Sequence, residues 1–213
     1  MLTGAGDAFC SGGEVSGMGG SSSAPKPVAE RIEELTRKQK ALTQKLYELN
    51  KVTIAALPGA AAGAGLSIAL ACDLRVASSK GFITTAFKNV GLSGDYGASW
   101  FLPRLIGLAK AKELFYPADR VGAEEGLRLG IFNQVFPEET FCEDSFNYAR
   151  EIADGPTATL SLMKKNLHAG MDQKLGVSLR LEAEHMISNI GAEEAKEAIS
   201  AFREKRKPQF HKG

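Results

Sequence analysis

The pattern of apolar and polar positions changes along the chain. Short apolar runs bounded by glycine or proline are typical of strands, and we expect these at residues 1–3, 52–57, 74–77, 82–87 and 131–136. Apolar residues at helical spacing predict helices, which we expect at residues 28–49, 65–72, 97–105, 109–116, 123–129, 138–153, 157–169, 175–189 and 192–207. The pattern therefore predicts a mixed α/β part at residues 1–136 and a helical part at residues 137–213.

Three segments interrupt this pattern. Residues 16–27 are rich in Gly, Ser and Pro, which predicts a mobile loop. Gly170, Gly191 and Pro208 are expected to end helices. Residues 52–72 carry no charge and are long enough to cross a bilayer, but their high Ala and Gly content predicts buried core instead.

The composition excludes several classes of protein. The chain has 213 residues, of which 44% are hydrophobic, so it is not a wholly disordered protein. Lys and Arg number 26 against 25 Asp and Glu, and this balance argues against a nucleic-acid binder. Three cysteines and three histidines without ligand spacing predict neither a disulfide framework nor a metal site. Because the first residues do not look like a signal peptide, we expect a cytoplasmic protein without a membrane span.

Two glycine-rich bends follow predicted strands, at residues 9–14 (FCSGGE) and 59–65 (GAAAGAG). Neither matches GxGxxG or a lysine-containing phosphate loop. Small residues allow backbone N–H groups to approach a ligand closely, and two such groups can converge on one oxygen to stabilise an oxyanion. Tight packing alone would also explain the two bends, so both interpretations are open.

Several blocks of the sequence resemble the enoyl-CoA hydratase/isomerase (crotonase) superfamily. They are AFCSGGE, TIAALPGAAAGAGLSIALACDLRVAS, VGLSGDYGASWFLPRLIG, AKAKELFYPADRVGAEEGLRLGIFNQVFP and EAISAFREKRKPQF. The resemblance implies a spiral of ββα units followed by a C-terminal helical trimerisation region. It also implies an acyl-CoA thioester as substrate, no further cofactor, and assembly into homotrimers or hexamers. Family members usually have more chain before the first block, so an N-terminally shortened member is expected.

The resemblance also assigns site residues. The thioester oxygen would lie between the N–H groups of Ser11 and Ala64. Ala64 stands where glycine is usual, and it is compatible with this role if its φ is negative. The residues expected to line the substrate site are Cys10, Gly12, Gly13, Gly63, Gly65, Phe87, Gly94 and Trp100.

The acid/base residues depart from the family's hydratases. The two glutamates of those enzymes would fall at Ser67 and Phe87, and neither side chain can exchange protons near neutral pH. Asp95 stands where isomerases of the superfamily have an aspartate, which favours it as a proton shuttle. Alternatively, Asp95 caps the helix expected near Gly97. An apolar pocket of Phe82, Phe87 and Trp100 would raise the pKa of Asp95.

Three functions are therefore open: an enoyl-CoA isomerase using Asp95, an enoyl-CoA hydratase, and a non-catalytic CoA-binding subunit.

A basic cluster near the C-terminus has two interpretations. It could bind the CoA phosphates, or it could be a solvated helix end. The cluster consists of Arg203, Lys205, Arg206 and Lys207.

Overall fold

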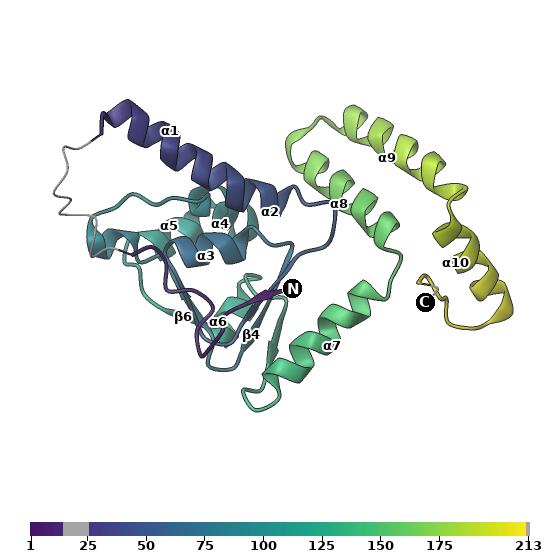
Figure 1. Ribbon diagram of the computed structural model, residues 1–213, viewed down its shortest axis with the longest axis horizontal. Helices are drawn as coiled ribbons and strands as arrows, with labels where there is room; N and C mark the ends of the chain where they lie inside the picture. The colour runs from purple at the N-terminus through teal and green to yellow at the C-terminus, as the bar shows by residue number, and fades with distance from the viewer. Residues whose placement is uncertain (15–25, 212–213) are drawn as a thin grey trace. The chain divides into compact units, whose positions relative to one another are not determined.

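The computed structural model describes residues 1–14 and 26–211, and Figure 1 shows its elements with the labels used below. Contacts group the chain into two units, residues 1–49 with 53–146 and residues 50–52 with 147–213. All strands of the described residues belong to the first unit. The expected division after residue 136 stays a prediction, and most of the loop predicted at residues 16–27 lies outside the described residues.

Four parallel strands form the first sheet, in the order β1-β2-β4-β7. They are β1 (Leu2–Thr3), β2 (Ile54–Leu57), β4 (Leu74–Ser78) and β7 (Gln134–Phe136). All four residues of β2 are buried, as is typical of a parallel strand covered on both faces. This burial explains why the sequence of β2 is a continuous apolar run without alternation.

The second sheet has the order β3-β5-β6 and consists of β3 (Ala60–Ala62), β5 (Phe82–Thr84) and β6 (Val121–Gly122). Strands β2 and β3 are consecutive in the chain but belong to different sheets, and a helix follows them. Strands β4 and β5 repeat this arrangement. The repeated unit confirms the expected α/β fold built from a spiral of ββα units.

The helices complete both units. In the first unit they are α1 (Val28–Gln39), the π-helical segment η1 (Lys40–Gln44), α2 (Lys45–Tyr47), α3 (Ala64–Leu70), the 3-10 segment η2 (Phe87–Val90), α4 (Ala98–Ile106), α5 (Leu108–Phe115) and α6 (Ala123–Arg128). Helix α7 (Phe141–Ala153) begins in the first unit and ends in the second. The second unit continues with α8 (Thr157–Asp172), α9 (Leu175–Ile190) and α10 (Glu193–Glu204). This confirms the predicted C-terminal helical region.

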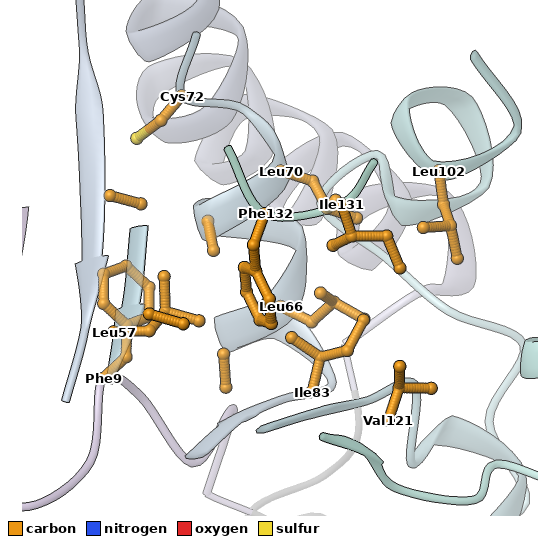
Figure 2. Close-up of a cluster of buried hydrophobic side chains, with 14 of the residues drawn as sticks. Phe9, Leu57, Leu66, Leu70, Cys72, Ile83, Leu102, Val121, Ile131 and Phe132 are labelled. Atoms are coloured by element: carbon orange, nitrogen blue, oxygen red, sulfur yellow. The ribbon is translucent and has the colours of Figure 1, made fainter. Parts of the chain in front are cut away.

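The hydrophobic core of the first unit lies where α3 packs against both sheets, and Figure 2 shows its side chains. Leu66 of α3, Leu57 of β2 and Ile83 of β5 meet there and are fully or almost fully buried. Phe132 also packs in this core, and a β-carbon at Gly126 would lie 2.5 Å from its ring. Burying each large aliphatic side chain contributes about 1.5–3 kcal/mol.

Two strand predictions differ from the structure. The strand expected at residues 82–87 ends at Thr84, because the Thr85 hydroxyl donates to the carbonyl of Leu114 (3.2 Å) and Ala86 adopts a left-handed φ of 55°. The strand expected at residues 131–136 begins only at Gln134. The buried Arg75 binds the carbonyl of Ile131 through its Nε (2.8 Å), so the preceding residues turn into the core.

Two local expectations were also wrong. Residues 60–62 were expected within a glycine-rich bend but form strand β3, because β5 pairs along them. Gly170 does not end a helix, since α8 continues to Asp172. A β-carbon at Gly170 would meet nothing within 4 Å, so this glycine is tolerated on an open helix surface.

Residues 52–72 form β2, β3 and α3, whose apolar side chains are largely buried as expected. Among the helices of the described residues, none has both the length and the hydropathy that crossing a bilayer requires.

We expect Leu66→Ala to lower the free energy of unfolding by about 2–5 kcal/mol, because it removes buried contacts and leaves a cavity. Leu127→Ala on the surface of α6, where the side chain is 43% exposed, serves as the control and should cost less than about 1 kcal/mol. Urea unfolding followed by circular dichroism measures both. Equal losses for the two variants would contradict this account of the core.

Candidate active site

The first glycine-rich bend lies along strand β3. The amides of Phe9 and Cys10 donate to the carbonyl of Ala60 (3.0 and 3.1 Å), and the amide of Ala62 donates back to the carbonyl of Cys10 (3.0 Å). Gly12 follows with a φ of +100°, and a β-carbon there would lie 2.8 Å from the carbonyl oxygen of Ala62. Both the conformation and the close approach therefore require glycine at this position.

The second bend leads from β3 into α3. Gly63 has a φ of +53° and precedes Ala64, the first residue of the helix. Ala64 itself is not among the non-glycine residues with positive φ, which meets the condition set for its role. A β-carbon at Gly65 would lie 2.2 Å from the carbonyl oxygen of Cys10, so this glycine allows the two bends to touch.

The two bends bring the predicted amide donors into one region. A β-carbon at Gly12 would lie 3.6 Å from the amide nitrogen of Ala64, and Ser11 immediately precedes Gly12. Within residues 1–14 and 26–211, neither the Ser11 N–H nor the Ala64 N–H donates to a protein acceptor. Unused amide donors in adjacent bends are the feature that an oxyanion hole requires.

Phe87 connects the second bend to the segment that carries Asp95. Its ring is buried and stacks on Phe115 at 6.3 Å. A β-carbon at Gly63 would lie 3.6 Å from the Phe87 ring, and one at Gly94 would lie 3.4 Å from it. The Phe87 side chain therefore forms an apolar surface between Gly63 and Gly94.

Asp95 lies in a segment of unusual backbone conformation. Gly94, Tyr96 and Gly97 all have positive φ, of 105°, 53° and 90°. Such conformations persist only where the surrounding structure holds them, and they cluster at functional sites. Oδ1 of Asp95 is buried and has no hydrogen-bond partner among the described residues. Burial raises the pKa of this carboxyl above its ordinary value.

The interpretation of Asp95 as a helix cap was wrong. Helix α4 begins at Ala98 with Gly97 in the capping position, and no side chain caps it. The amide of Ala98 donates to the backbone carbonyl of Asp95 (3.4 Å), whereas the Asp95 carboxyl does not satisfy the helix end. This carboxyl is consequently left for another role.

Two residues hold the Asp95 segment through contacts that the sequence analysis did not predict. The hydroxyl of Ser67, fully buried in α3, donates to the carbonyl oxygen of Asp95 (2.9 Å). Oε1 of Gln39, at the end of α1, accepts a hydrogen bond from the amide of Tyr96 (3.0 Å). Nothing in the local sequence around either residue could have revealed these contacts, because the partners are 28 and 57 positions away.

A cavity of about 430 Å³ lies beside this segment, lined by one face of α1, η1 and α2 together with Gly97, Trp100 and Phe101. Trp100 packs edge-to-face on Tyr47 at 5.2 Å, and the guanidinium of Arg104 lies 3.7 Å from its ring. Ser11 and Ala64 are not among the lining residues.

The other expected site residues differ in position. The aromatic residues expected to surround Asp95 have separate surroundings: Phe87 is near Gly94, Trp100 lines the cavity, and Phe82 lies under Arg120. Cys10 is half-buried at the contact of the bends, whereas Gly13 is exposed at the edge of the described residues.

The described residues offer no metal site, and one residue of the basic cluster is paired with neighbouring carboxylates. No group of His, Cys, Asp and Glu among the described residues could hold a metal ion. In the basic cluster, Arg206 forms ion pairs with Glu197 and Glu204, both at 2.6 Å. This favours a structural role for Arg206 at the end of α10.

Comparisons with known proteins identify the family. A family model described as enoyl-CoA hydratase/isomerase matches residues 1–213. The chain is 36% identical over 211 residues to a "Probable enoyl-CoA hydratase" of Rhodobacter capsulatus, covering 99% of this chain and 79% of that protein. It is 33% identical over 210 residues, with the same coverage, to 1,2-epoxyphenylacetyl-CoA isomerase of Escherichia coli.

A solved structure described as enoyl-CoA hydratase subunit I of Geobacillus kaustophilus HTA426 has a TM-score of 0.88 and 33% identity, covering 99% of this chain and 79% of that one. The chain therefore belongs to the enoyl-CoA hydratase/isomerase (crotonase) family and is one of its enzymes.

We expect Asp95→Asn to raise the free energy of unfolding at neutral pH. Because the folded state raises the pKa of Asp95, it binds this proton more tightly than the unfolded state does, so stability falls as pH rises through the titration. The gain from the substitution should therefore vanish toward acidic pH. Thermal unfolding across a pH series measures it. The exposed Asp119→Asn should change the stability by less than about 0.5 kcal/mol, and an equal gain there would contradict the explanation.

Proposed function

We propose that this enzyme acts on an acyl-CoA thioester and moves the double bond of an enoyl-CoA. The Ser11 and Ala64 amides form the oxyanion hole, and Asp95 carries the proton. The observation that carries the proposal is the contact of the two bends, which brings Gly12 next to the amide of Ala64 and leaves both amide donors unused by the described residues. The buried, unpartnered Oδ1 of Asp95 supports the second part.

The chemistry balances with a single carboxylate. Asp95 takes a proton from C2 of a 3-enoyl-CoA, and the electron pair moves onto the thioester oxygen to form a dienolate. The two amides stabilise the charge on that oxygen. Protonated Asp95 then returns the proton to C4, which leaves the double bond between C2 and C3. The step consumes neither water nor an oxidant.

The environment of Asp95 suits this role. A carboxylate whose pKa is raised by burial is a stronger base than an exposed one, and proton transfer is most efficient when the pKa lies nearer the working pH. The unused Oδ1 leaves one oxygen available for a proton from carbon. Among the described residues, no charged group of the kind that would lower the pKa of Asp95 contributes to the shift.

Addition of water by two glutamates is disfavoured. Ser67 is buried, and its hydroxyl donates to the backbone carbonyl of Asp95. Phe87 is also buried, and its apolar side chain has no proton to exchange. The relatives' names include both activities, hydratase in Rhodobacter capsulatus and isomerase in Escherichia coli. The residues at the two glutamate positions favour the isomerase.

We expect Asp95→Asn to lower kcat for isomerisation of a 3-enoyl-CoA at least about a hundredfold, because it removes the proton carrier. Binding of a saturated acyl-CoA, measured by calorimetry, should be nearly unchanged. Asp119→Asn is the matched control and should retain full activity.

Unchanged turnover in Asp95→Asn would remove this residue from the mechanism. Rapid loss of crotonyl-CoA absorbance through water addition would favour the hydratase alternative. Binding of acyl-CoA without turnover of any enoyl-CoA in a panel would favour a non-catalytic subunit.

We also infer that the chain assembles as a homotrimer or hexamer through its second unit. Several large apolar side chains of that unit are more than two-thirds exposed, and burying them against another copy of the chain would remove this apolar surface from water. They are Leu167, Leu175, Ile187 and Phe202, at 72%, 73%, 71% and 85%.

Sedimentation should give three or six times the mass of one chain, and Leu167→Glu combined with Ile187→Glu should reduce this mass, because charge opposes burial of an apolar contact. Lys165→Glu changes an exposed side chain on α8, the helix that carries Leu167, and should leave the mass unchanged. A monomeric native protein would refute the inference.

A further inference from the structure

The peptide group between Asp95 and Tyr96 is held at both edges by side chains from other elements. Its carbonyl oxygen accepts the hydroxyl of Ser67 at 2.9 Å, and its N–H donates to Oε1 of Gln39 at 3.0 Å. Ser67 belongs to α3, whereas Gln39 ends α1, so two separate helices bind one peptide plane. The mechanism proposed above uses neither side chain.

The hydroxyl of Ser67 lies within hydrogen-bond distance of two backbone carbonyls, that of Gly63 one helical turn earlier (3.3 Å) and that of Asp95 (2.9 Å). Each carbonyl also accepts a backbone amide, from Ser67 at 3.1 Å and from Ala98 at 3.4 Å respectively, so distance distinguishes the two. The bond to Asp95 is shorter, and Ser67 is fully buried, so water does not compete for its single proton. The contact therefore links the helix that begins at Ala64 to the segment that carries Asp95.

The segment needs such support. Tyr96 has a φ of 53°, and it stands between Asp95 and Gly97, which has a φ of 90°. A tyrosine rarely adopts this conformation without outside contacts. If the 95–96 peptide rotated, the backbone on both sides would turn with it, and the Asp95 carboxyl would move.

We propose that Ser67 and Gln39 are positioning residues that fix the Asp95–Tyr96 peptide and thereby hold the Asp95 carboxyl at a set distance from the amide of Ala64. This inference rests on the proposed function in giving Asp95 and Ala64 their roles. It also gives a role to Ser67, which stands at a position where family hydratases are expected to have a glutamate: in this chain the serine orients Asp95, the proton carrier.

Four variants distinguish a positioning role from a role in the stability of the fold alone. Ser67→Ala and Gln39→Leu each remove one hydrogen bond to the peptide. Gln39→Glu keeps the acceptor oxygen and is the conservative counterpart. Ser78→Ala is the matched control, because Ser78 is also buried in the first unit, and its hydroxyl binds only the amide of Lys80 among the described residues.

For a 3-enoyl-CoA we expect Ser67→Ala and Gln39→Leu to lower kcat by about tenfold to a hundredfold, the range caused by displacing a reacting group by about 1 Å. KM should change less than about threefold. Gln39→Glu should recover most of the activity, and Ser78→Ala should match the wild type. In an Asp95→Asn background, Ser67→Ala should have no further effect, because the group it positions is absent.

A second readout does not require turnover. Carboxyl-carbon NMR of the full chain follows the titration of Asp95, whose pKa is raised by burial. In Ser67→Ala and Gln39→Leu this pKa should move down toward the ordinary value as the carboxyl relaxes into water. It should stay unchanged in Ser78→Ala, and circular dichroism establishes that each variant is folded.

The outcomes distinguish the two proposals. If the wild type does not isomerise enoyl-CoA but the Asp95 pKa falls in both variants, the positioning role stands and the proposed function fails. If both variants keep the wild-type kcat and the wild-type Asp95 titration, the positioning proposal is overturned while the proposed function stands. A fall in kcat that Asp95→Asn does not mask would also overturn it.

Discussion

The contact between the two glycine-rich bends is the constraint on which the site depends. Hydrogen bonds between Cys10 and strand β3 bring the bends together, and Gly12 and Gly65 allow an approach that any β-carbon would block. Helix α3 starts directly from the second bend, and the Asp95 segment is bound to that helix through Ser67. The predicted amide donors and the predicted proton carrier therefore belong to one connected structure.

The fold could be largely predicted from the sequence where local pattern and tertiary packing agree. The long amphipathic helices have a period that only a helix satisfies, and the buried strand β2 is a short apolar run that the Pro58-Gly59 turn ends. Strand β3 was missed because alanines have little preference for strands, and only pairing with β5 makes these residues extended. The early end of β5 was missed for a similar reason, since a hydroxyl contact with α5 at Leu114 turns the chain.

The candidate site, like the fold, could be predicted only in part. The two bends could be found because glycine and small residues mark close backbone approach in any context. The raised pKa of Asp95 was expected from burial, but the conformation of Gly97 and the unpartnered Oδ1 could not be predicted, because they depend on contacts from other elements. Gln39 was missed altogether, since on its own helix it is one polar residue among many and its partner is 57 positions away.

The π-helical segment η1 places one more residue in its turn than an α-helix would, and it lies directly after Gln39. Such bulges often occur at functional sites. Because the wider turn accommodates this extra residue, the α-helical turns before and after it keep nearly the same faces. Deleting a single residue from Lys40–Gln44 would therefore restore regular α-helical geometry and leave Gln39 on the side that faces Tyr96. The chain can thus change its length by one residue at this turn without exchanging the side chain that binds the 95–96 peptide.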